Sequence, residues 1–132
     1  MKLAAAALAC ALVLTACGDN APPPNQKTIK IRGAEQDALH QLDALNLAIA
    51  LKRAIYSAGY LCKRVSDGGF VAEYQNLDMW MARCTDGKTT TDWAVFAGAD
   101  GSAQVRLCKD VDTSQLPKCE IKQRPKGEFA KL

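Results

Sequence analysis

Residues 77–109, LDMWMARCTDGKTTTDWAVFAGADGSAQVRLCK, decide the fold of this chain. Short runs in which apolar residues recur at every second position predict β-strands over 77–84, 90–97 and 103–109. Asp86-Gly87 and Asp100-Gly101 separate these runs and are typical of turns. Because consecutive strands with short connections usually pair with one another, the stretch predicts an antiparallel meander. A fourth strand is expected before it, over 60–65, followed by a turn at Asp67-Gly68-Gly69.

The register of this meander follows from the lengths of its loops. If the Asp86-Gly87 and Asp100-Gly101 loops each hold three residues with a glycine bulge, one face of the last three strands is apolar throughout. That face is expected to pack on a helix and carries Leu77, Met79, Met81, Trp93, Val95, Ala97, Val105 and Leu107. The opposite face is mixed, as a solvated or ligand-facing surface is, and carries Asp78, Trp80, Ala82, Cys84, Asp92, Ala94, Phe96, Gln104, Arg106 and Cys108.

Outward from the strands, residues 34–58 predict one N-terminal helix, with Gly33 as N-cap and Gly59 after its end. One apolar stripe is expected to face the sheet and holds Ala38, Leu42, Leu45, Ile49 and Tyr56. A second line, Leu47, Leu51 and Ile55, lies roughly opposite. Two accounts of it stay open: the linker or the C-terminal tail covers it, or it contacts a partner or a second copy. The predicted class is therefore α+β, one helix on a four-stranded antiparallel meander.

The N-terminus indicates export. After Met1-Lys2 comes an apolar run over 3–14, too short for a membrane span and typical of a secretory signal peptide. It ends Leu14-Thr15-Ala16-Cys17, which resembles the lipobox of bacterial lipoproteins. The resemblance implies cleavage after residue 16 and acylation of Cys17. The mature protein would then be a lipoprotein that carries palmitate and is anchored to a membrane. Gly18, where an inner-membrane retention signal has Asp, favours the outer membrane facing the periplasm.

This interpretation divides the chain into four segments. They are the signal peptide over 1–16, a lipidated Cys17 with a Pro-containing tether over 17–33, a folded domain over 34–119 and a basic tail over 120–132. The tether contains Pro22-Pro23-Pro24, which favours an extended polyproline II conformation. Residues 118–132 hold five basic and two acidic residues, whereas 34–117 hold eight basic and eleven acidic ones. The basic end is interpreted as solvated, with contact to an anionic envelope component as the alternative.

The cysteines of the mature chain predict disulfides, because an exported protein meets an oxidising environment. Cys62, Cys84, Cys108 and Cys119 allow three pairings, and no Cys-x-x-Cys spacing suggests zinc. The strand placement favours Cys62–Cys84 together with Cys108–Cys119, since Cys84–Cys108 would cross the third strand. No metal and no cofactor are expected.

No constellation of nucleophile, acid and base stands out, so the chain is not expected to be an enzyme. The lone histidine, His40, is interpreted as a surface residue, and Asp110 and Asp112 as a solvated acidic loop. The binding surface is expected on the mixed sheet face at Trp80, Phe96 and Arg106, since aromatic residues and arginine dominate binding hot spots. Alternatively, the disulfides or the tail cover these side chains.

Length and charge narrow the function further. A chain of 132 residues allows one domain at most, and a net charge of +3 argues against a nucleic-acid binder. The hypothesis is a lipid-anchored binding, adaptor or assembly component of the cell envelope, with an envelope protein as partner. The segment Trp80–Lys88 followed by Trp93-Ala94-Val95-Phe96 resembles the strand-Cys-turn-strand pattern of lipoprotein lysozyme inhibitors. That resemblance implies, as the alternative, inhibition of a lysozyme-like envelope enzyme.

Overall fold

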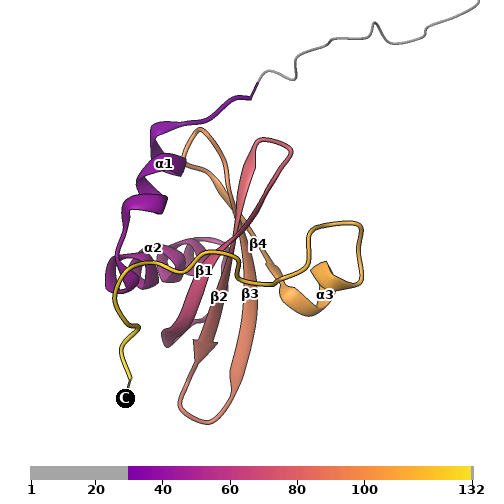
Figure 1. Cartoon of the computed structure of the whole chain (residues 1–132). Coiled ribbons are helices and arrows are strands. Elements are labelled where there is room, and N and C mark those ends of the chain that lie inside the picture. The colour runs from indigo at the N-terminus through magenta and orange to yellow at the C-terminus, as the bar shows by residue number, and fades with distance from the viewer. Residues whose placement is uncertain (1–29, 132) are drawn as a thin grey trace, which may run out of the picture.

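The computed structural model describes residues 30–131, so the predicted signal peptide, Cys17 and the tether up to residue 29 lie outside the described residues. The elements run in the order α1 (Ala34–Gln41), α2 (Ala44–Ser57), β1 (Arg64–Tyr74), β2 (Leu77–Thr85), β3 (Thr90–Ala97), β4 (Ala103–Leu107) and α3 (Cys108–Asp112) (Figure 1). The strands form one antiparallel sheet in sequence order, β1-β2-β3-β4. The α+β class and the four-stranded meander are therefore confirmed.

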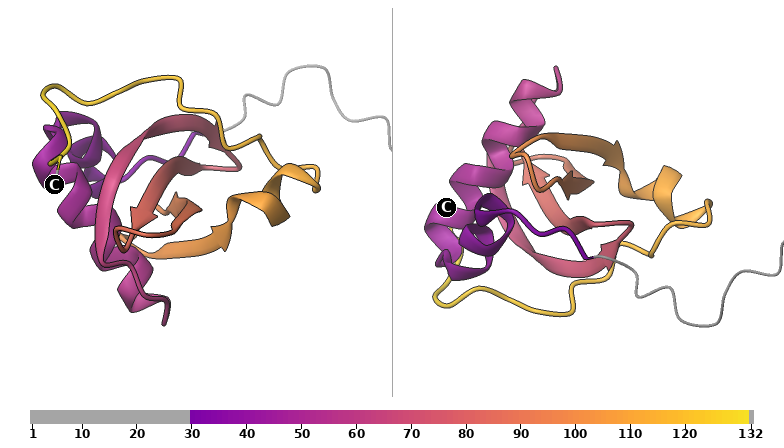
Figure 2. Two further views of the ribbon diagram at one scale, coloured as in Figure 1. Left: turned by 90° about the horizontal axis from the view of Figure 1, so that it is seen from below. Right: turned by 90° about the horizontal axis from the view of Figure 1, so that it is seen from above.

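Two helices, rather than the single predicted one, precede the sheet. Leu42 has extended backbone (φ −72°, ψ 142°) and ends α1, and Asp43 begins α2 as its N-cap. The Asp43 carboxylate accepts a hydrogen bond from the backbone N–H of Asn46 at 2.9 Å, which satisfies a donor in the first turn. This aspartate is the physical reason for the break that the continuous apolar pattern over 34–58 concealed. Figure 2 shows both helices on the same side of the curled sheet.

The side of α2 that faces the sheet is the reverse of the expected one. Leu47, Leu51 and Ile55 are at most 1% exposed, whereas Leu45 and Tyr56 are 59% and 55% exposed. The buried line packs with Trp80, Trp93 and Val95 in the core between helices and sheet. Lys52 lies between Ile49 and Tyr56 at helical spacing, so turning that stripe inward would have buried a cation without a partner.

The register of β2 also differs from the prediction, because the β2–β3 loop holds four residues, Asp86 to Thr89, and not three. Thr85 pairs with Thr90, and the Asp86 carboxylate accepts hydrogen bonds from the backbone N–H groups of Lys88 and Thr89. One additional loop residue moves every β2 side chain to the other face. The parity of β3 and β4 is as predicted, since Val95 pairs with Val105.

Both faces of the sheet are covered, so the mixed face is not the open surface that was expected. A second core on the side away from α2 contains Val71, Met79, Met81, Ala94 and Phe96. Cys108 and Val111 of α3, together with Leu116 and Ile121 beyond it, close this second core. The helical layer and the α3 segment thus sandwich the sheet (Figure 2).

Strand β1 runs through residues 67–69, where a turn was predicted, and the turn falls instead at Gln75-Asn76, both with positive φ (49° and 62°). The C-terminal segment lies along β1: the N–H of Phe70 donates to the carbonyl of Gln123 at 2.9 Å. Further on, the N–H of Ala44 donates to the carbonyl of Lys126, and Phe129 packs on the helix-side core. The boundary at residue 119 is therefore wrong, because 120–131 contribute to the fold (Figure 1).

Two disulfides join Cys62 to Cys84 and Cys108 to Cys119, the pairs that the strand placement favoured. The first links the segment before β1 to β2, and its cysteines are 2% and 5% exposed. The second ties the start of α3 to the segment that returns across the sheet. Loops of 22 and 11 residues closed by such bridges each correspond to roughly 3 kcal/mol of stabilisation.

Candidate functional site

The predicted binding face at Trp80, Phe96 and Arg106 does not form. Trp80 and Phe96 are each 3% exposed and lie on opposite faces of the sheet, in separate cores. Arg106 is exposed and pairs with Ala94, so it shares the side of Phe96 and not that of Trp80. The four-residue β2–β3 loop is the cause, because it turned Trp80 toward the helices.

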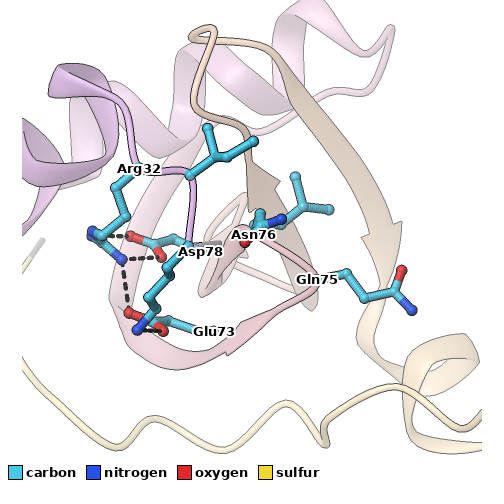
Figure 3. A pocket seen from close by; sticks show the side chains of 8 residues that line it. Arg32, Glu73, Gln75, Asn76 and Asp78 are labelled. Atoms are coloured by element: carbon cyan, nitrogen blue, oxygen red, sulfur yellow. Dashed lines mark hydrogen bonds and ion pairs between the residues drawn. The ribbon is translucent and has the colours of Figure 1, made fainter. Parts of the chain in front are cut away.

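A polar cluster joins the segment before α1 to the β1–β2 hairpin (Figure 3). The Asp78 carboxylate, 1% exposed, accepts two hydrogen bonds from the Arg32 guanidinium at 3.1 and 3.0 Å. Arg32 also bonds Asp37 and Glu73. His40 Nε2 lies 2.9 Å from the same Asp78 carboxylate, and its ring packs at a tilt against Phe70 and Trp80. His40 is an exposed residue, as predicted, but its side chain is only 26% exposed and belongs to this network.

Both cations of this cluster, Lys30 and Arg32, are paired with carboxylates. The hydrogen bonds that Arg32 donates to Asp78 and Asp37 raise the pKa of Arg32 above its ordinary value despite partial desolvation. The ion pair with Lys30 lowers the pKa of Glu73, with a smaller contribution from Arg32. A hollow of about 320 Å³ lies beside the cluster, near the Gln75-Asn76 turn. Because each cation here already faces a carboxylate, the arrangement fits a clasp between the N-terminal segment and the sheet better than an ion-binding site.

A groove of about 480 Å³ runs between α2 and the β3–β4 end of the sheet. Its volume falls within the range of ligand pockets. The buried side chains of Leu51 and Val95 line it together with the small residues Ala50, Ala54, Ala97 and Ala103. Glu35, Arg53 and Ser102 supply polar groups around it. Because the side chains on both walls are small, they leave the space between α2 and the sheet unfilled, and this apolar strip stays accessible.

Strand β4 borders the groove and is one of the two edge strands of the sheet. It pairs only with β3 within residues 30–131, whereas the other outer strand, β1, carries the C-terminal segment at Phe70. Ala103 lies on the groove side of β4, and Gln104 points to the opposite side. An unpaired strand edge beside an apolar groove is the arrangement by which sheets accept an additional strand.

The helix α2 presents a second apolar surface, the outer face of α2, formed by Leu45, Ile49 and Tyr56, each more than two-fifths exposed. Beyond the end of the helix Leu61 is 80% exposed, whereas the Tyr60 ring packs against the core residue Trp93 at a centroid distance of 4.6 Å. This face is the stripe that sequence spacing assigned to the core. It points away from the sheet because Leu47, Leu51 and Ile55 occupy the inner side.

Comparison with models of protein families, with curated proteins and with solved structures finds no match to this chain. Between residues 30 and 131, no helix combines the length and the apolar character needed to cross a membrane. In that same part of the chain, no three His, Cys, Asp or Glu side chains come together in a way that suits a metal ion.

Sequence reasoning missed the groove and the Arg32–Asp78–His40 cluster. The cluster joins residues 38 to 46 positions apart, so no local pattern marks it. The groove had a faint signal in the alanines at 50 and 54 and in the small residues of the 97–103 segment. Small residues at helical spacing opposite a small-residue loop leave space, but only the tertiary arrangement brings them together.

Proposed function

We propose that this protein is a lipid-anchored binding or adaptor component of the bacterial cell envelope that holds an extended segment of another envelope protein in the groove beside β4. The anchor is the acylated Cys17, on the outer membrane and facing the periplasm. Catalysis is not part of this proposal.

Sequence supports the anchor. Leu14-Thr15-Ala16-Cys17 follows an apolar run of the length of a signal peptide, and it resembles a lipobox. The two disulfides fit the same setting, because such bonds persist in oxidising compartments.

The groove between α2 and β3–β4 is the observation that carries the binding function. A segment that pairs with β4 would place alternate side chains against Leu51, Val95 and the surrounding alanines. Main-chain hydrogen bonds would supply affinity, and the apolar groove would select side chains. Glu35 and Arg53 offer one charge of each sign at its border.

The anchor is tested by labelling cells with radioactive palmitate. Wild-type protein is expected to incorporate the label, and Cys17→Ala to accumulate as an unlabelled precursor or soluble form. Equal labelling of the two proteins would contradict acylation at Cys17.

The groove is tested by crosslinking intact envelopes and recovering the protein with its partners. Ala103→Phe fills the groove and is expected to reduce partner recovery at least fivefold, a loss of about 1 kcal/mol in binding free energy. Gln104→Phe is the matched control, because it adds the same ring one residue along β4 on the other side. Equal recovery with both variants, or no partner with wild type, would contradict the groove as the binding site.

The same experiment separates the alternative, an inhibitor of a lysozyme-like enzyme. The segment that resembles the inhibitors forms the β2–β3 hairpin, whose loop over Asp86 to Thr89 is exposed. Recovery of a muramidase crosslinked through this loop, unaffected by Ala103→Phe, would favour inhibition over the adaptor function.

A further inference from the structure

The outer face of α2 lacks a partner within the described residues. Leu45, Ile49 and Tyr56 recur on it at helical spacing, and the exposed Leu61 follows shortly after the end of the helix. A strip of this kind on one side of a short helix is the signature of a surface that rests on an apolar layer.

The charges within the segment that carries the strip have one sign. No Asp or Glu occurs between Ala44 and Cys62, whose charged residues are Lys52 and Arg53; Asp43 lies just before this segment as the N-cap of α2, and Lys63 and Arg64 lie just after it. Lys52 lies within the strip, between Ile49 and Tyr56, and Arg53 lies along its border. Lys52, Arg53 and Lys63 take part in no ion pair within residues 30–131, in contrast to Arg32 and Arg83, although the Lys52 ammonium donates a hydrogen bond to the Lys63 carbonyl at 2.9 Å.

This combination favours a lipid surface over a second copy of this chain. Long cationic side chains beside apolar ones extend their charged ends to headgroups while their aliphatic stems stay on the apolar layer. A tyrosine ring, present in the strip at Tyr56, prefers the boundary between headgroups and acyl chains. A second copy of α2 would instead bring Lys52 and Arg53 toward equal charges.

We propose that the outer face of α2 lies on the surface of a membrane that contains anionic lipids and thereby sets the orientation of the domain on it. This inference rests on the anchor at Cys17 and deepens it: the acyl chains hold the protein at the membrane, and α2 fixes which side faces the lipid. The groove, on another side of α2, then opens along the membrane surface.

The length of the linking segment permits this contact. Lys30 lies thirteen positions after Cys17, and a chain of that length spans at most roughly 45 Å. An anchored domain therefore meets the membrane as an intramolecular partner at high effective concentration. A strip of three apolar side chains with two cations beside it would bind weakly as a free ligand, but under that condition weak contacts are enough to orient the domain.

The experiment uses the acylated full-length mature protein on vesicles of phosphatidylcholine alone or with 30% phosphatidylglycerol. Flotation first establishes that the protein is anchored to both. Hydroxyl-radical oxidation, read residue by residue by mass spectrometry, then compares Leu45, Ile49 and Tyr56 with Ile31. Ile31 is the matched control, because it is as exposed as Leu45 but lies outside the face.

Oxidation of the three α2 residues is expected to fall at least threefold on the anionic vesicles relative to phosphatidylcholine, with Ile31 unchanged. Lys52→Glu combined with Arg53→Glu should abolish this protection without altering the melt, and 0.5 M salt should weaken it. Flotation with unchanged oxidation would overturn the α2 contact and leave the anchor standing. Failure to float for lack of an acyl chain would overturn both, and protection that depends on protein concentration without vesicles would assign the face to a second copy.

Discussion

Gly69 lies against Gln123: a Cβ atom on Gly69 would stand 2.5 Å from the carbonyl oxygen of Gln123 and equally close to the Ile121 side chain. The same stretch of β1 receives the C-terminal segment through the hydrogen bond between Phe70 and Gln123. Gly69, predicted to lie in a turn, therefore lies in a strand, where the close approach of the C-terminal segment leaves no room for a side chain.

Gly69→Ala should lower the free energy of unfolding by roughly 2 kcal/mol. The added methyl group would clash with the backbone carbonyl of Gln123, which cannot move aside as a flexible side chain can. Urea denaturation measures the loss. In a chain that ends at Glu120 the added methyl group meets no tail, so Gly69→Ala should cost well under 1 kcal/mol there. An equal cost in both backgrounds would contradict the contact as its cause.

Asp78→Ala should destabilise the protein by about 3 kcal/mol, since it leaves Arg32 and His40 without their shared buried acceptor. Glu73→Ala is the matched control: it removes an exposed carboxylate bonded to the same arginine and should cost less than 1 kcal/mol. Thermal or urea unfolding of both variants makes the comparison. Similar losses would show that burial of Asp78 does not govern the strength of the clasp.

Leu51→Ala and Leu45→Ala remove the same atoms from opposite sides of α2. Leu51 is 1% exposed, so its truncation should cost about 2–5 kcal/mol through lost burial and a cavity. Leu45 is exposed, and its truncation should change stability by less than about 0.5 kcal/mol. Urea midpoints with unchanged slopes would report the difference, and a larger loss from Leu45→Ala would reverse the assignment of inner and outer sides.

Acidification should destabilise the β2–β3 loop through Asp86. Hydrogen bonds from the backbone N–H groups of Thr89 and Lys88 lower the pKa of Asp86 below its ordinary value. A carboxylate with a lowered folded-state pKa contributes stability above its unfolded pKa, and this is lost as the pH falls through the folded value. Urea unfolding between pH 5 and pH 2.5 should show a smaller loss for Asp86→Asn than for wild type, and parallel pH profiles would contradict this account.

Sequence alone predicted the elements that depend on local pattern and on spacing. Alternation and glycine turns predicted three of the strands and the meander, and the meander selected the disulfide pairs. The side of α2 that faces the sheet was wrong because two apolar lines competed, yet Lys52 within one of them was a usable signal. A charged residue inside an apolar stripe should weigh more than the number of its apolar neighbours.

The candidate site was less predictable, since it depends on single-residue differences in loop length. The predicted three-residue loop at Asp86-Gly87 would place Trp80 and Phe96 on the same face of the sheet. The observed loop has four residues, Asp86 to Thr89, and this puts the two side chains on opposite faces. His40 gained its partner from Asp78, a residue 38 positions away. Such contacts follow from register and layer packing, which local sequence patterns determine only when every loop length is known.

The Cys62–Cys84 bond also has a mechanical consequence. Under the proposed function, tension applied between the proposed anchor at Cys17 and the proposed partner at β4 would first open the Arg32 clasp and then unwind α1 and α2. At Cys62 the load passes through the disulfide directly to β2, so β1 is bypassed and stays folded. The pulled-out segment, from residue 30 to residue 62, limits the extension to roughly 110 Å, after which the load falls on the covalently supported sheet.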